Sequence, residues 1–219
     1  MTNPDEKQPV THVLMVIDMS GSMQALAEDV RGGFNSYKAK LGEDADREYR
    51  LTVTLFDTEF IPVAVDTPLA EVPDLTVSNY VPRGGTALND AIGQTLAEFD
   101  LKHGKVRKHE RALVVINTDG FENSSREYST ARIRELIAEK DKSDRWGFVY
   151  LGAGPNAWAA GNAYGLGATS MATSQTSHGT RSTYDAVAVA SASYSRGASI
   201  GETFSVLAET DGVADPDAK

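Results

Sequence analysis

Two aspartates and three hydroxyl residues are the strongest candidates for chemistry in this chain. Asp18 directly follows the apolar run 13–17, and Asp119 comes shortly after the apolar run 113–116. Ser20 and Ser22 are two positions apart and can face the same way, and Thr86 follows two glycines. Together they supply only oxygen atoms, which suit Mg²⁺, Mn²⁺ or Ca²⁺ and not zinc or copper.

The elements that must position these residues are predicted from hydrophobic patterning. Continuous apolar runs at 13–17, 113–116 and 146–151 are typical of strands buried on both faces of a parallel sheet. An apolar stripe from Met23 to Leu41 predicts a helix with Ser22 as its N-cap. Further helices are expected over 86–99, 126–140, 156–164 and 180–194, with a short strand over 168–172. This alternation predicts an α/β fold with a doubly wound, mostly parallel sheet and helices on both faces.

One hairpin departs from that alternation. Leu51, Val53 and Leu55 alternate with polar residues, so we expect a strand with one covered and one polar face. Residues 57–59 then form a turn into a second strand, which gives the sheet one antiparallel edge. Residues 66–85, rich in proline and glycine, are expected to be a loop.

In an open parallel sheet, ligands gather outside the carboxyl ends of the strands, near the switch in strand order. If their strands are neighbours, Asp18 and Asp119 point into one crevice together with Ser20, Ser22 and Thr86. Mg²⁺ takes six oxygens, and three neutral hydroxyls compensate little of its charge. A position left open on such an ion attracts an anionic oxygen, so we expect cation-dependent capture of an Asp or Glu from a protein partner.

Composition limits the remaining classes of function. The chain has 219 residues, a formal charge of −10 and no cysteine, which excludes disulfides, thiolate nucleophiles and cysteine-based zinc sites. The acidic balance argues against nucleic-acid binding, and no apolar run approaches the length of a membrane span. The polar start lacks the apolar core of a signal peptide, so a cytoplasmic location is expected. We predict a disordered N-terminus over 1–9, one domain over 10–207 and an acidic disordered tail over 208–219.

These residues also carry a family resemblance. The runs Asp18-Met19-Ser20-Gly21-Ser22 and Thr118-Asp119-Gly120, with Thr86 between them, resemble the metal-ion-dependent adhesion site of von Willebrand factor type A domains. The resemblance implies a Rossmann-like sandwich in which Ser20, Ser22 and Thr86 bind Mg²⁺ or Mn²⁺. By the same resemblance, Asp18 and Asp119 bind the ion directly or through water.

The same family implies where a partner would touch and in what setting. Partner contacts are expected at the residues that flank the ligands: Met19, Gly21, Gly85 and Gly120. Gln24 and Ala25 stand where integrin-type members carry the acids of an adjacent cation site, so no second ion is expected there. With no signal peptide expected, the chain looks more like the small intracellular members of bacteria and phages, which often accompany ATPases. An ATPase-associated system is therefore one candidate partner, and the oligomeric state stays open.

Two other functions remain as alternatives. A Mg²⁺-dependent phosphohydrolase would use Asp18 as nucleophile, but such enzymes need a general acid two residues later, where this chain has Ser20. The second alternative is a scaffold or virion component whose site is vestigial. In both cases partner capture through the cation is absent.

Several other features are interpreted as structural. The glycine-rich run 152–157 matches a loose dinucleotide fingerprint, but no acid follows about 20 residues later, so we interpret it as a turn that starts a helix. The four histidines show no metal-ligand spacing, and the basic run 102–111 is predicted to be a solvated loop. Asp90 is interpreted as a solvated acid in the first turn of its helix.

Overall fold

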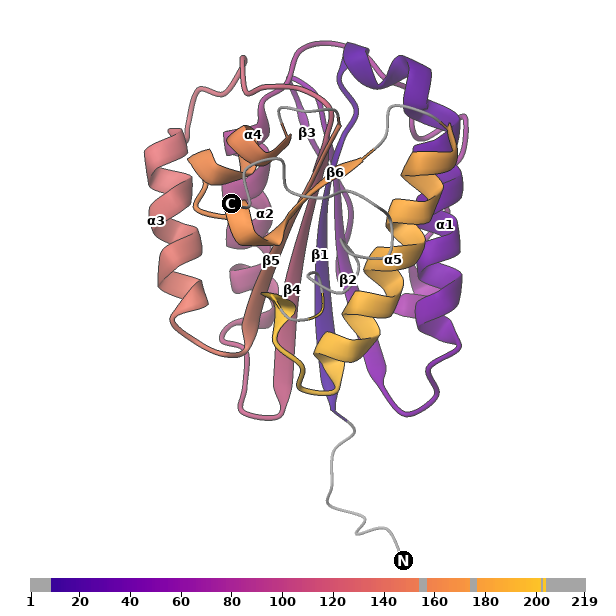
Figure 1. Ribbon diagram of the computed structural model, residues 1–219, viewed down its shortest axis with the longest axis vertical. Coiled ribbons are helices and arrows are strands. Elements are labelled where there is room, and N and C mark those ends of the chain that lie inside the picture. The colour runs from indigo at the N-terminus through magenta and orange to yellow at the C-terminus, as the bar shows by residue number, and fades with distance from the viewer. Residues whose placement is uncertain (1–8, 154–156, 174–176, 202, 204–219) are drawn as a thin grey trace, which may run out of the picture.

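The computed structural model describes residues 9–153, 157–173, 177–201 and 203. A six-stranded sheet forms its centre, in the order β3-β2-β1-β4-β5-β6 (Figure 1). The strands are β1 (Val10–Asp18), β2 (Glu48–Phe56), β3 (Phe60–Pro68), β4 (Glu110–Thr118), β5 (Trp146–Ala153) and β6 (Ser170–Thr173). All neighbours pair in parallel except β2 and β3. The predicted α/β class, with a mostly parallel sheet and one antiparallel edge, is confirmed.

Helices cover both faces of this sheet (Figure 1). On one face lie α1 (Ala27–Gly42) and α5 (Ser177–Ser195), and on the other lie α2 (Leu88–His103), α3 (Thr130–Asp141) and α4 (Ala157–Ala163). Alternate residues of β1 enter the two resulting cores: Met15 and Ile17 pack on the α1 side, and Leu14 and Val16 pack on the α2 side. Burial on both faces explains why this strand is apolar without a break.

Two helix starts differ from the sequence prediction. The first helix is preceded by a 3₁₀ segment, Gly21–Leu26, so Ser22 lies inside this segment and does not cap α1. The third helix begins at Thr130 and not at residue 126, with the Ser129 side chain as the cap that accepts from Arg132 N. The residues just before it are held in a loop by the carboxylate of Asp90, which accepts from the backbone N–H groups of residues 126–128 at 2.7–2.9 Å. Asp90 is therefore a loop anchor and not a solvated acid.

The polar face of β2 is also covered, contrary to prediction. Thr52 and Thr54 are buried, and the Thr54 hydroxyl accepts a hydrogen bond from Thr95 of α2 at 2.9 Å. Threonine fits such a position because its hydroxyl finds a partner in the helix while its methyl group packs. The loop predicted over 66–85 contains the end of β3 and a single 3₁₀ turn, Leu69–Glu71.

The last third of the described chain follows the predicted order. The strand expected over 168–172 is found at Ser170–Thr173, and the last helix runs from Ser177 to Ser195. The predicted start of the short helix at residue 156 and the predicted disorder over 1–8 and 208–219 fall outside the described residues. In the described part of the chain no helix combines the length and the apolar character that crossing a bilayer requires.

Candidate functional site

The strand order places Asp18 and Asp119 at one edge of the sheet. β1 pairs with β2 on one side and with β4 on the other, and Ile17 is opposite Asn117. The chain therefore changes direction across the sheet at β1, which is where open α/β sheets bind ligands. The predicted neighbourhood of the two strand ends is thus what the structure has.

Hydrogen bonds connect four of the five predicted ligands. Asp18 Oδ1 accepts from Ser20 N at 2.6 Å, and the Ser20 and Ser22 hydroxyls lie 3.0 Å apart. The Ser22 hydroxyl then donates to Asp119 Oδ1 at 2.6 Å. The chain of contacts runs from β1 through the 3₁₀ segment to the end of β4, so oxygens distant in sequence converge at one point.

The fifth residue, Thr86, joins this group from the loop before α2. A Cβ built on Gly120 would lie 3.3 Å from Thr86 Oγ1 and 3.7 Å from Ser22 Oγ, so both hydroxyls face this glycine. Thr86 is fixed there because its N–H donates to Asn123 Oδ1 at 2.9 Å and its carbonyl accepts from Asn123 N at 3.0 Å. A side chain at position 120 would fill the space that the two hydroxyls share.

The turn after β1 is held by bonds to the neighbouring loops. Met19 N donates to the Phe56 carbonyl at 2.6 Å, Gly21 N donates to the Gly84 carbonyl at 3.1 Å, and Arg83 N donates to the Met19 carbonyl at 2.8 Å. Gly84 has a φ of +68°, a backbone conformation that glycine adopts without a steric penalty. The buried Tyr80 hydroxyl donates to the Asp18 carbonyl at 2.6 Å. These bonds fix the turn before any ligand arrives.

Asp18 is a buried charge with an unusual protonation behaviour. Its side chain lies in the interior, and burial raises the pKa of its carboxyl group from 3.8 to about 6, against the lowering effect of the hydrogen bond from Thr118. The nearby Asp119 raises this pKa further. Nearby negative charge and desolvation are what a bound cation relieves, so the donor set fits a divalent ion.

The four residues predicted to touch a partner differ in how exposed they are to solvent. Gly21 is exposed, and Gly85 and Gly120 are partly exposed. Met19 is only 4% exposed and its side chain belongs to the core on the α1 side. The prediction that Met19 contacts a partner therefore does not fit its side chain.

Two acids shape the rim of this site: sequence reasoning did not identify Glu122, and it interpreted Asp90 as a solvated acid. Glu122 accepts from Asn89 N at 2.8 Å and from the N–H groups of Ser124 and Ser125 at 2.9 and 2.8 Å. Together with Asp90 it holds the loop between β4 and α3 against the start of α2. The only sequence signal was the position of these acids near loops, which does not identify their partners.

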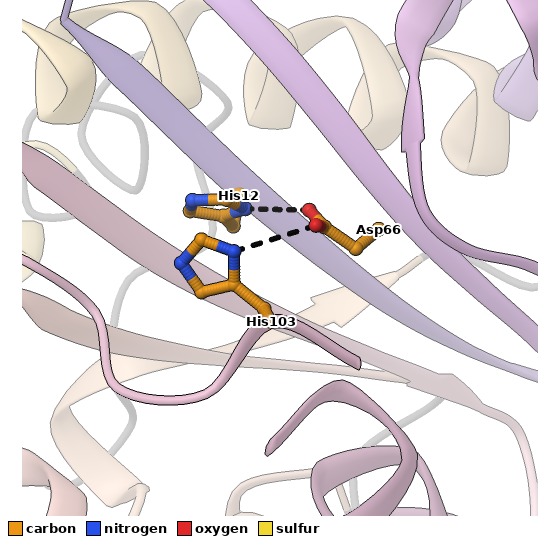
Figure 2. A group of neighbouring side chains, drawn as sticks. All are labelled: His12, Asp66 and His103. Atoms are coloured by element: carbon orange, nitrogen blue, oxygen red, sulfur yellow. Dashed lines mark hydrogen bonds and ion pairs between the residues drawn. The ribbon is translucent and has the colours of Figure 1, made fainter. Parts of the chain in front are cut away.

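A second polar group, which sequence reasoning also missed, lies near the opposite end of β1. His12, Asp66 and His103 converge there, close enough together to hold a metal ion (Figure 2). His103 is the last residue of α2 and is largely buried, so this part of the basic run 102–111 is not the solvated loop that was predicted. The two histidines are far apart in sequence, and no spacing rule connects them.

Comparison with known proteins adds information on the fold. No family model matches this sequence, and no curated protein matches it either. A von Willebrand factor type A structure from Catenulispora acidiphila matches with a TM-score of 0.63 at 14% identity, over 83% of this chain and 42% of that one. The PilB minor pilin of Streptococcus sanguinis matches with a TM-score of 0.60 at 13% identity, over 90% and 64%. Proximal thread matrix protein 1 from the mussel byssus matches with a TM-score of 0.58 at 14% identity, over 82% and 45%.

These matches show a von Willebrand A-like, Rossmann-like fold. In each of them this chain spans less than two thirds of the matched chain.

Proposed function

We propose that this chain is a non-enzymatic protein-binding module whose ligand is an aspartate or glutamate side chain of a partner. Asp18, Ser20, Ser22, Thr86 and Asp119 would hold one Mg²⁺ or Mn²⁺ ion at the carboxyl edge of the sheet. When bound, such an ion supplies an electropositive coordination position that a carboxylate can fill. A chain without cysteine is compatible with the intracellular setting that we infer for it.

The observation that carries this proposal is the convergence of oxygen atoms from three loops. The contacts Ser20–Ser22 and Ser22–Asp119, at 3.0 and 2.6 Å, join the turn after β1 to the end of β4. Thr86 Oγ1 faces the same space from the loop before α2. Three hydroxyls and two carboxylates with no nitrogen or sulfur match the preference of hard divalent cations.

The surroundings of the site offer a surface to a protein. Ser22 is exposed, whereas Asp18 and Ser20 are buried, so the group opens to solvent at the Ser22 side. Phe121, which follows Gly120, is 60% exposed, and an exposed aromatic ring beside a binding site is typical of an interaction surface. With a net charge of −10, the chain favours partners with basic residues around the key carboxylate.

No specific observation favours the phosphohydrolase alternative. Ser20 occupies the position that would need a general acid, and its N–H donates to the carboxylate that would attack. A serine hydroxyl does not protonate a leaving group near neutral pH.

The first test measures whether a divalent cation binds these residues. Thermal denaturation in EDTA is compared with denaturation in excess Mg²⁺ or Mn²⁺, and we expect the cation to raise the Tm of the native chain. A cation present at about 100 times its Kd would stabilise the folded state by about 2.7 kcal/mol. Ser20→Ala should remove this rise. Ser36→Ala is the matched control: it removes a hydroxyl that donates to Asp185, outside the oxygen site, and should keep the rise.

The second test concerns the partner. Affinity purification with the native chain in Mg²⁺ should capture a protein that EDTA releases and that Ser20→Ala does not retain. Capture that persists in EDTA or with Ser20→Ala would refute the mechanism. Substituting candidate acidic residues of the captured protein one at a time should then identify one whose loss abolishes binding.

A further inference from the structure

A second group of titratable side chains consists of His12, Asp66 and His103, which Figure 2 shows together. His12 comes from β1, Asp66 from β3 and His103 from the end of α2. Their side chains are 1%, 10% and 8% exposed. His12 precedes Asp18 by six residues of one strand, which is about 20 Å. The group is therefore separate from the oxygen site.

Each of the two imidazoles approaches the carboxylate of Asp66 with its Nδ1 atom. His12 Nδ1 is 2.9 Å from Asp66 Oδ1, and His103 Nδ1 is 3.3 Å from Asp66 Oδ2 (Figure 2). One ligand atom from each of the three residues lies within 4.8 Å of the others. Ligand atoms around a tetrahedral zinc ion, with bonds of about 2.0–2.2 Å, are about 3.3–3.5 Å apart. The separations of the three donors, from 2.9 Å to at most 4.8 Å, bracket that spacing.

A second carboxylate faces the other ring nitrogen of both histidines. Glu110 Oε2 is 3.0 Å from His103 Nε2 and 3.9 Å from His12 Nε2. Glu110 is itself fixed by the N–H of Arg107, at 2.8 Å. Histidines that bind a metal through one ring nitrogen commonly donate the other N–H to a carboxylate. Glu110 is within hydrogen-bond distance of His103 Nε2, and it faces His12 Nε2 from beyond that distance.

The ligand carboxylate is also oriented by a neighbour. Arg50 Nε donates to Asp66 Oδ1 at 2.9 Å, which leaves Oδ2 on the side of His103. Asp66 has a φ of +42°, and its N–H donates to the Thr52 hydroxyl at 3.0 Å. A non-glycine residue in this region of φ costs free energy and persists where its surroundings fix it. Here it belongs to an irregular stretch of the β2–β3 pairing and carries the carboxylate that meets both imidazoles.

One ring nitrogen of this group has no hydrogen-bond partner. His12 Nε2 is buried and unpaired, although it faces Glu110. With a proton on Nδ1 for Asp66, the lone pair of Nε2 would face a carboxylate oxygen. With Nδ1 bound to a metal, the proton resides on Nε2 and faces the same oxygen favourably. Metal binding at Nδ1 would therefore place the Nε2 proton on the side of Glu110, whose Oε2 is 3.9 Å away.

We propose that His12, Asp66 and His103 bind one divalent ion of the zinc class, and that Glu110 is a positioning residue that orients the His103 imidazole. Two imidazoles and one carboxylate select zinc or a similar transition metal over Mg²⁺ and Ca²⁺. The ion would connect β1, β3 and the end of α2. It is a different ion in a different place from the one that the oxygen site would hold.

The test uses the full chain with zinc and cobalt as probes. After treatment with EDTA and removal of the chelator, the Ser20→Ala variant is titrated with Zn²⁺, so that the oxygen site does not contribute. We expect one zinc per chain. His103→Gln should lose this uptake, and Glu110→Gln should weaken affinity about 10–100-fold. His178→Gln, which changes a histidine of α5 on the other face of the sheet, should bind as Ser20→Ala does.

Folding of each variant is checked separately by circular dichroism and by its Tm in EDTA. Because His103→Gln removes a buried side chain, a second measurement does not depend on it. Co²⁺ added to the native chain should give the intense visible absorption of a four-coordinate ion, and Zn²⁺ should displace it. No stoichiometric zinc uptake, no such cobalt spectrum, or uptake that persists in a folded His103→Gln would overturn the proposal. The Mg²⁺-dependent rise in Tm is expected to survive in His103→Gln, so the two sites are tested independently.

Discussion

Replacing Asp18 by asparagine should stabilise the protein when no metal is present. Asp18 is fully buried and its pKa is raised from 3.8 to about 6, chiefly by desolvation. A carboxyl group whose pKa is raised on folding binds its proton more tightly in the folded state. It therefore costs no stability below about pH 4, and it destabilises the folded state increasingly as the pH rises from about 4 to about 6. Above pH 6 the whole cost is present.

The size of this effect follows from the shift. A rise of about 2 units corresponds to about 3 kcal/mol at about 1.4 kcal/mol per unit. Asparagine resembles the neutral acid: its carbonyl can accept from Ser20 N, and its amide can donate to Thr118 Oγ1, which has the Gly120 carbonyl at 3.2 Å as an alternative acceptor. Allowing for imperfect geometry, we expect Asp18→Asn to gain about 1–3 kcal/mol at pH 7. At about 2–4 °C per kcal/mol, the Tm rises by several degrees.

The assay is thermal denaturation of both proteins in EDTA between pH 4 and pH 8. The gain of Asp18→Asn over the native chain should be present at pH 7 and should shrink toward pH 4. Asp57→Asn is a matched control, because Asp57 is equally buried but pairs with Arg83 at 2.8 Å and accepts from Glu59 N at 2.7 Å. The same chemical change should destabilise there. An Asp18→Asn protein less stable than the native chain at pH 7, or a gain independent of pH, would refute the reasoning.

Three further substitutions test other contacts. Gly120→Val should fold but lose most of the Mg²⁺-dependent rise in Tm, because its side chain would enter the space 3.3 Å from Thr86 Oγ1; an undiminished rise would argue against a shared cation there. Asp90→Ala removes the acceptor of three backbone N–H groups and should cost about 1–3 kcal/mol, with faster hydrogen exchange confined mainly to residues 126–128. Gly93→Ala should cost about 1–3 kcal/mol in urea denaturation despite the better helix propensity of alanine, because the new Cβ would lie 2.6 Å from the Tyr128 ring; a more stable variant would show that the ring moves away easily.

The fold and the proximity of the five oxygen-bearing residues could be predicted because their sequence signals lie within single elements. β1 is apolar throughout since both of its faces are covered, and the hairpin between β2 and β3 follows from a polar turn between two short apolar patterns. Asp18 and Asp119 could be assigned to one edge because the carboxyl ends of parallel strands meet at the same edge of a sheet.

What the sequence could not supply depends on contacts between distant residues. Asp90 of α2 accepts from the N–H of Arg126, 36 positions later, and holds the residues before Thr130 in a loop, so helix periodicity near residue 126 predicts the wrong boundary for α3. Thr54 looks like a surface residue by alternation, but Thr95 covers it. Such effects belong to packing between elements, which a pattern within one element does not contain.

The direction of α2 explains why the molecule has a polar group at each end of β1. β4 runs parallel to β1, so the chain must reach the edge of the sheet where both strands begin before β4 can start. α2 carries the chain there, from the loop that contains Thr86 at the carboxyl edge to His103. Its first end therefore brings Thr86 to the carboxyl edge beside Ser22, and its last residue brings an imidazole to His12. Even-numbered residues of β1 face α2, so His12 and Asp18 point to the same side, with Leu14 and Val16 between them in the core. β1 and α2 therefore each contribute to both candidate sites, one at each end, and the apolar residues between the two ends keep the two groups of charges apart.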